Sequence, residues 1–212
     1  MELLIFLFKV IGISLSGVMA PGPVTATAIS MGARSRYAGV LIAVGHGIVE
    51  FPLMVLIVLG AGEILKLPAA QIIIGLAGGA FLLWMAVGML SSLRSSLQQE
   101  TKVAKSTPLL AGIVLSAGNP YFLFWWATVG LALATMATGI GIWAFALFAV
   151  VHWLCDFVWL TILSWASFKG TGLFGPRGQK IVLLVCGVAL VFFGLFFIYN
   201  AVEVLRNLLR SS

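Results

Sequence analysis

Charged residues are scarce in this sequence. Asp, Glu, Lys and Arg together make up 8% of its 212 residues, against about 25% in an ordinary soluble domain. So few charges cannot cover a water-facing surface, which excludes a soluble globular protein. The net charge of +6 falls in short segments between apolar runs, where it sets membrane orientation and meets anionic lipid. We therefore expect no nucleic-acid partner.

Cysteines are few, and the motifs of common enzymes are missing. Cys155 and Cys186 lie inside apolar runs without metal-ligand spacing, so neither points to a redox role. The sequence contains no HExxH, GxSxG or Walker motif, and it therefore predicts a protein that is not an enzyme, uses no ATP and needs no cofactor. The amino terminus lacks the basic stretch of a cleavable signal peptide, so we expect it to remain attached as the first membrane span.

Apolar residues dominate instead. They make up 62% of the sequence and come in long unbroken runs, whereas the strands of a transmembrane barrel need short alternating segments. Because a helix crosses the bilayer with roughly 20 apolar residues, the sequence predicts an all-α, polytopic membrane protein with six transmembrane helices. The predicted spans cover residues 3–31, 39–62, 69–91, 108–134, 139–167 and 179–202.

A polar stretch over residues 92–107 divides the chain, interpreted as a single transmembrane domain over residues 1–212, into two halves of three spans each. Repeat one covers about residues 1–91 and repeat two about residues 108–212. With an odd number of spans in each half, the two repeats must have inverted topology. Of the 12 Lys and Arg residues, 8 fall in the first, third and fifth loops. The positive-inside rule therefore places these loops in the cytoplasm and both termini outside.

Both histidines of the sequence precede an acid by four residues in a predicted span. His46 is followed by Glu50 in the second span and His152 by Asp156 in the fifth, and the two pairs are 106 residues apart. Residues i and i+4 share one face of a helix. An ionisable group that faces lipid near the midplane costs roughly 2.5–3.5 kcal/mol, so we expect all four to point inward and form a substrate-binding or coupling site. The alternative is a purely structural cluster that ties helices together.

Prolines interrupt the first and fourth predicted spans. Pro21, Gly22 and Pro23 stand inside the first apolar run, and Asn119 and Pro120 stand inside the fourth. Proline removes a backbone donor and clashes with the preceding turn, so both spans must break or kink. Irregular backbone at membrane depth is tolerated where it lines a cavity, and breaks in corresponding spans of two halves indicate the binding site of a transporter.

These features resemble the LysE/RhtB superfamily of amino-acid exporters along nearly the whole chain. The resemblance rests on PGP in the first span, on a basic turn before a glycine-rich second span (Arg34 to Gly39), and on NP in the fourth span. It implies export of amino acids or related small metabolites, driven by the proton-motive force, through the plasma membrane of a prokaryote, by a homo-oligomer. Two features depart from the superfamily pattern. Tyr121 follows NP where many members have a basic residue, and the His/acid pairs are not general.

The sequence leaves three interpretations open. In the first, an amino-acid exporter, Glu50 and Asp156 take up and release protons, tuned by the two histidines, while the broken backbone holds the charged groups of the cargo. In the second, a divalent metal exporter, the cargo is bound by His46, Glu50, His152 and Asp156. In the third, the chain is a membrane scaffold or an intramembrane enzyme.

Overall fold

The computed structural model describes residues 2–61, 64, 67–92, 107–170 and 176–211, and within these ranges it contains helices and no strand. The prediction of an all-α protein is therefore confirmed. Five helices are long and apolar enough to cross a membrane, so the chain is a multi-pass membrane protein. Most of the predicted linker between the two halves lies outside the described residues.

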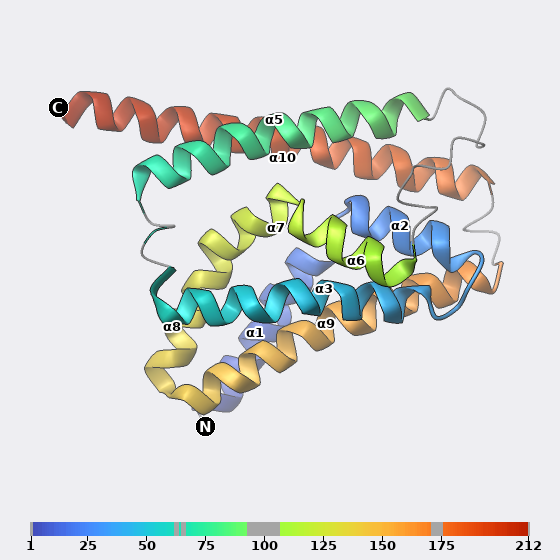
Figure 1. Cartoon of the computed structure of the whole chain (residues 1–212), viewed down its shortest axis with the longest axis horizontal. Coiled ribbons are helices and arrows are strands. Elements are labelled where there is room, and N and C mark those ends of the chain that lie inside the picture. Colours follow the sequence, from blue (N-terminus) through green and yellow to red (C-terminus); the bar gives the residue numbers. More distant parts are fainter. Residues whose placement is uncertain (1, 62–63, 65–66, 93–106, 171–175, 212) are drawn as a thin grey trace.

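The long helices run back and forth along the longest axis of the molecule (Figure 1). The amino end of α1 and the carboxyl end of α10 lie toward one end of the molecule, opposite the turn that joins α2 to α3 (Figure 1). In chain order the elements are α1 (Glu2–Val18), α2 (Pro23–Gly32), α3 (Ala38–Leu56), η1 (Ile57–Ala61), α5 (Pro68–Ser92), α6 (Pro108–Ala117), α7 (Pro120–Trp125), η3 (Trp126–Gly130), α8 (Leu131–Ile140), α9 (Ile142–Phe168) and α10 (Pro176–Ser211).

The second, third, fifth and sixth predicted spans each coincide with a long helix: α3, α5, α9 and α10. The first and fourth are divided. The first predicted span consists of α1 and α2, and the fourth of α6, α7, η3 and the beginning of α8. Both breaks end at a proline, Pro23 or Pro120, which becomes the first residue of the next helix. Proline is tolerated there because the amide of that position has no helical partner in any case.

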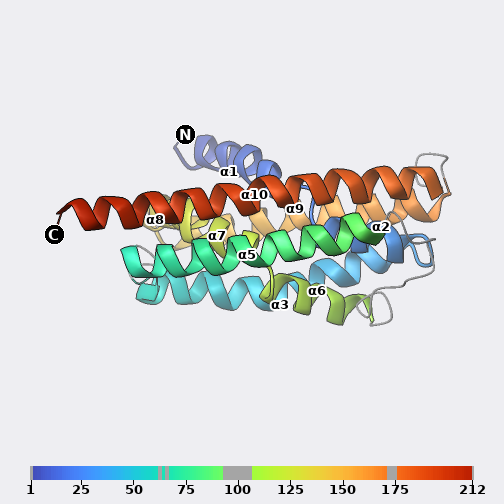
Figure 2. The same ribbon diagram turned by 90° about the horizontal axis from the view of Figure 1, so that it is seen from above.

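The helices that carry the core pack closely through small residues. α5 and α10 lie side by side in both views (Figures 1 and 2), and a Cβ added at Gly79 of α5 would lie 2.7 Å from the carbonyl oxygen of Gly194 on α10. α3 packs against α6 and α9, while α1 and α2 lie along α9. Small residues allow such helices to approach at backbone distance without lipid between them. This packing fixes α3 and α9 relative to each other.

Replacing Gly112 of α6 with Ala is expected to lower the melting temperature of the detergent-solubilised protein. A Cβ at this position would collide with the carbonyl group of Ile42 on α3, and overpacking of this kind costs about 1–3 kcal/mol. The matched control is Gly12→Ala, because nothing lies within 4 Å of a Cβ added there. A melting temperature that is unchanged by Gly112→Ala would contradict the close approach of α3 and α6.

Candidate functional site

Four ionisable side chains meet in the interior between α3 and α9. His46 and Glu50 lie one turn apart on α3, and His152 and Asp156 have the same spacing on α9. These residues are 7%, 0%, 3% and 9% exposed, respectively. We call this group the His/carboxylate cluster. The structure thus brings together all four of the ionisable residues that the sequence singled out.

Glu50 lies at the centre of the cluster. Its Oε1 atom is 3.1 Å from Nε2 of His46, 3.1 Å from Nε2 of His152 and 3.2 Å from Nε1 of Trp126, which donates to it. Asp156 lies farther from the imidazoles, with an oxygen 3.8 Å from each Nε2 atom. A carboxylate oxygen that faces three N–H groups is an acceptor only. Glu50 is therefore the group that orients both histidines.

A serine contacts the outer nitrogen of each histidine. Nδ1 of His46 lies 2.7 Å from Oγ of Ser116, and Nδ1 of His152 lies 2.8 Å from Oγ of Ser14. The Ser116 hydroxyl donates to the carbonyl oxygen of Gly112 at 2.6 Å. Because a hydroxyl has a single proton, this geometry favours His46 as the donor to Ser116. Both ring nitrogens of both histidines are thus engaged with protein atoms.

Two carboxylate oxygens of the cluster are left without hydrogen bonds. Oε2 of Glu50 and Oδ2 of Asp156 are both buried, and no group in the described part of the chain donates to either. A buried acceptor without a donor loses the hydration that it would have in water. Asp156 also lines a cavity, and it is the most exposed of the four cluster residues.

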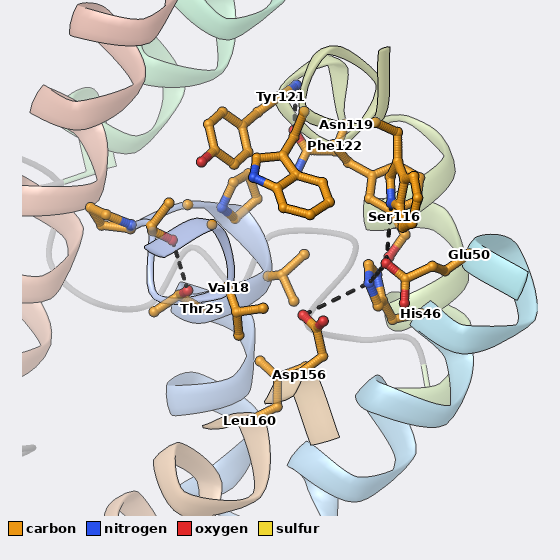
Figure 3. A pocket seen from close by; sticks show the side chains of 18 of the residues that line it. Val18, Thr25, His46, Glu50, Ser116, Asn119, Tyr121, Phe122, Asp156 and Leu160 are labelled. Carbon is orange, nitrogen blue, oxygen red and sulfur yellow. Dashed lines mark hydrogen bonds and ion pairs between the residues drawn. The ribbon is translucent and has the colours of Figure 1, made fainter. Parts of the chain in front are cut away.

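The cavity beside the cluster has an empty volume of about 770 Å³, part of which is open to the outside. Figure 3 shows the Asp156 carboxylate directed into it, with His46 and Glu50 to one side of Asp156. Aromatic rings from the α7 region and α10 form much of the remaining wall, contributed by Tyr121, Phe122, Trp125, Trp126 and Phe193. A few polar groups among apolar and aromatic walls are typical of a small-molecule site.

The first helix break supplies backbone to this cavity. Pro21, Gly22 and Pro23 all line it. Gly22 is the N-cap residue of α2 in an extended conformation, and no side chain caps this helix end. The amino end of α2, with the positive end of its helix dipole, therefore opens on the cavity.

The second break differs from the first in how its helix end is capped. Asn119 lines the cavity, and its Oδ1 atom accepts a hydrogen bond from the amide of Tyr121 at 3.0 Å. Pro120 is buried behind it and faces α5, where a Cβ added at Gly78 would lie 2.8 Å from the proline Cβ atom. Four of the five residues predicted at the two breaks thus line the cavity, and Pro120 instead packs between helices.

A protein-family model matches most of the chain. The model of the family described as LysE type translocator matches residues 15–201. The chain belongs to this family. No curated protein and no solved structure is similar enough to the chain to count as a match. LysE type translocators are transporters and not enzymes, and the matched region contains the whole His/carboxylate cluster and both helix breaks.

The same residues of this LysE-family chain are less well arranged to bind a divalent metal cargo than to form hydrogen bonds with one another. Ligand atoms of His46, Glu50 and Asp156 lie within 4.8 Å of one another. Ligands around a tetrahedral zinc ion are about 3.3 Å apart, so the set would have to contract. The indole N–H of Trp126 also points at Oε1 of Glu50, where it would oppose a cation. Hydrogen bonds account for the observed contacts without a metal.

Three residues of the cluster's surroundings escaped the sequence-based prediction: Ser14, Ser116 and Trp126. Hydroxyls in apolar helices usually bond to their own backbone, and Ser116 does so as well as contacting His46. A usable signal was the spacing between the serines, 102 residues, which is close to the 106 residues between the two histidines. Trp126 has no comparable signal in the sequence. Its neighbour Trp125 is also a tryptophan, so the sequence alone does not show which of the two contacts Glu50.

Proposed function

We propose that the protein is a secondary active exporter of amino acids or related small metabolites, driven by the proton-motive force across the plasma membrane of a prokaryote. The observation that carries this proposal is the His/carboxylate cluster, four buried ionisable groups beside a cavity that opens on broken backbone. Ionisable residues inside a membrane are expensive and mark transport pathways. Membership of the LysE type translocator family supports export in general.

In this proposal Asp156 is the exchange site and Glu50 is the fixed charge beside it. The carboxylate of Asp156 lines the cavity and makes no short hydrogen bond to either histidine. It binds either a proton or a cationic group of the cargo, and the two exclude each other. Such exclusion lets a proton that enters from outside displace cargo that came from the cytoplasm. Glu50, held by three N–H groups, keeps both histidines in place while Asp156 changes its partner.

We further propose that the halves of the single domain, residues 1–212, are inverted repeats that rock against each other. The contacts of the two serines support this: His46 of the first half bonds Ser116 of the second, and His152 of the second half bonds Ser14 of the first. Rocking of one repeat on the other gives alternating access in transporters of this construction. Six crossings, with basic loops in the cytoplasm and both termini outside, complete the proposed topology.

Everted membrane vesicles test the proposed function. When respiration acidifies their interior, vesicles that contain the protein are expected to accumulate a labelled amino acid from a panel of neutral, acidic and basic ones, and an uncoupler is expected to abolish the accumulation. Vesicles without the protein are the control. The same vesicles are offered zinc, manganese and cadmium in parallel.

The outcomes separate the interpretations. Uncoupler-sensitive accumulation of an amino acid supports the proposal, whereas accumulation that survives the uncoupler overturns proton coupling. Accumulation of a metal and of no amino acid would establish the second interpretation. Accumulation of neither cargo would overturn an export function of this kind and favour a scaffold.

A further inference from the structure

The two histidines of the cluster, although equivalent in their sequence spacing, contact serines that are bonded differently. Ser116 lies on α6 and Ser14 on α1, and the two residues are 1% and 0% exposed. A serine hydroxyl has one proton to donate and two lone pairs with which to accept. The group that receives the serine proton therefore decides whether the neighbouring imidazole nitrogen accepts a hydrogen bond or donates one.

Ser116 donates its proton away from His46. Its Oγ atom lies 2.6 Å from the carbonyl oxygen of Gly112 and 2.7 Å from Nδ1 of His46. If the hydroxyl proton pointed at His46, the oxygens of Ser116 and Gly112 would face each other with lone pairs, at a separation typical of oxygens that share a proton. The proton therefore lies between these two oxygens. Nδ1 of His46 must then carry a proton of its own to bond Ser116.

His46 consequently carries a proton on each ring nitrogen. Its Nε2 atom lies 3.1 Å from Oε1 of Glu50, which also accepts the indole N–H of Trp126. A carboxylate oxygen only accepts hydrogen bonds, so Nε2 must be the donor in this contact. An imidazole that donates from both nitrogens is an imidazolium cation. His46 and Glu50 thus form an ion pair within α3.

His152 has the opposite arrangement. Nδ1 of His152 lies 2.8 Å from Oγ of Ser14, and this hydroxyl has no other hydrogen-bond partner in the described part of the chain. Because Ser14 is fully buried, its proton has to be donated to Nδ1 to be satisfied. The ring proton of His152 then lies on Nε2, 3.1 Å from Oε1 of Glu50, and the ring is neutral. A second imidazolium at the same oxygen would also repel that of His46.

We propose that Ser116 and Ser14 are positioning residues that set different charges on the two histidines, so that His46 is an imidazolium and His152 is neutral. The charged groups that face His46 are Glu50 on its own helix and Asp156 on α9. The positive charge of His46 balances that of Glu50. Ionised Asp156, 3.8 Å from Nε2 of each histidine, then leaves the cluster with one negative charge in excess.

In the exporter proposed above, on which this step rests, the cluster has room for one positive charge at a time. Glu50 is saturated by three N–H groups. A further proton on His152 would break its bond to Ser14. Asp156 is therefore the group that one proton or one cationic group neutralises. This predicts the exchange of one proton for each molecule of cargo.

Nitrogen NMR of the protein in lipid bilayers, with histidine rings labelled with ¹⁵N, tests the charges without any substitution. The chain has two histidines, so its ring nitrogens give four signals. An unprotonated ring nitrogen resonates far from the protonated ones, and an imidazolium has none. At pH 7 we expect three protonated nitrogens and one unprotonated nitrogen. Two unprotonated nitrogens, or none, would overturn the proposal.

Ser116→Ala and Ser14→Ala make the same chemical change beside different histidines and test which ring is charged. Removing Ser116 leaves the Nδ1 proton of His46 without an acceptor, so we expect this ring to become neutral and a second unprotonated nitrogen to appear. Removing Ser14 should shift the signal of the unprotonated nitrogen and leave the number of such nitrogens at one. An unchanged spectrum in Ser116→Ala, or a changed number in Ser14→Ala, would overturn the assigned roles.

Proton counting in proteoliposomes separates failure of this inference from failure of the proposed function. The ratio of protons entering to amino-acid molecules leaving is measured for the wild-type protein, and the expected ratio is one. A ratio of two would refute the single vacancy while leaving proton-driven export in place. Amino-acid efflux without proton entry would refute the proposed coupling, whereas the nitrogen spectrum would still report the charges of the histidines.

Discussion

Replacing Glu50 with Gln is expected to reduce gradient-driven efflux at least about 100-fold and to destabilise the protein. The substitution removes the charge that orients His46, His152 and Trp126, and each hydrogen bond to a charged group contributes about 1.5–3 kcal/mol. The amide oxygen of Gln can still face the three N–H groups, with the amide nitrogen at the position of Oε2, but it carries no charge. Efflux in everted vesicles and the melting temperature in detergent measure the two effects.

Glu203→Gln is the control for this substitution. It makes the same chemical change on α10 at an exposed position outside the cavity, so we expect it to leave both efflux and melting temperature unchanged. Insertion of each variant is checked by the amount of protein in the membrane. Wild-type efflux in correctly inserted Glu50→Gln protein would remove Glu50 from the mechanism.

Replacing Asp156 with Asn is expected to abolish gradient-driven efflux, again by at least about 100-fold, but to leave the melting temperature close to that of the wild type. Asp156 makes no short hydrogen bond to the histidines, which lie 3.8 Å away, so its charge contributes little to holding α3 and α9 together. Asn fills the same volume, but it neither takes up a proton nor neutralises a cationic group. The loss is therefore functional, of the order expected when a group acts directly on charge transfer.

The melting temperature and the efflux rate together distinguish Asp156→Asn from Glu50→Gln. The melting temperature should fall in Glu50→Gln and not in Asp156→Asn, while efflux should be lost in both. Asp156→Glu, which restores the carboxylate on a longer side chain, is expected to recover part of the efflux. If Asp156→Asn exports cargo at the wild-type rate, Asp156 is a structural residue.

Much of the site could be predicted from the sequence because its signals are local. The i,i+4 spacing places His46 with Glu50 and His152 with Asp156 on helix faces, and the insertion cost of ionisable groups requires those faces to turn inward. The prolines of the first and fourth spans likewise mark breaks at which helices α2 and α7 begin. Both arguments use only residues that are close in the sequence and the fact that the surroundings are apolar lipid.

The rest depends on which helix lies beside which, and this is a long-range property. Nothing near Glu50 in the sequence indicates that His152 and Trp126 donate to the same oxygen. Nor does the pairing of each histidine with a serine of the other half follow from local spacing. Likewise, the sequence presents the two breaks as equivalent, and only the side-chain geometry of Asn119 separates them.

The most direct test of the central claim is substrate-dependent proton movement in proteoliposomes that contain a pH-sensitive dye. With wild-type protein and an outward gradient of transported amino acid, protons are expected to enter as the amino acid leaves, whereas Asp156→Asn and Glu50→Gln liposomes are expected to show no coupled proton entry. Amino-acid efflux from wild-type liposomes without proton entry, or proton entry at the wild-type rate in Asp156→Asn, would contradict a coupling site in the His/carboxylate cluster.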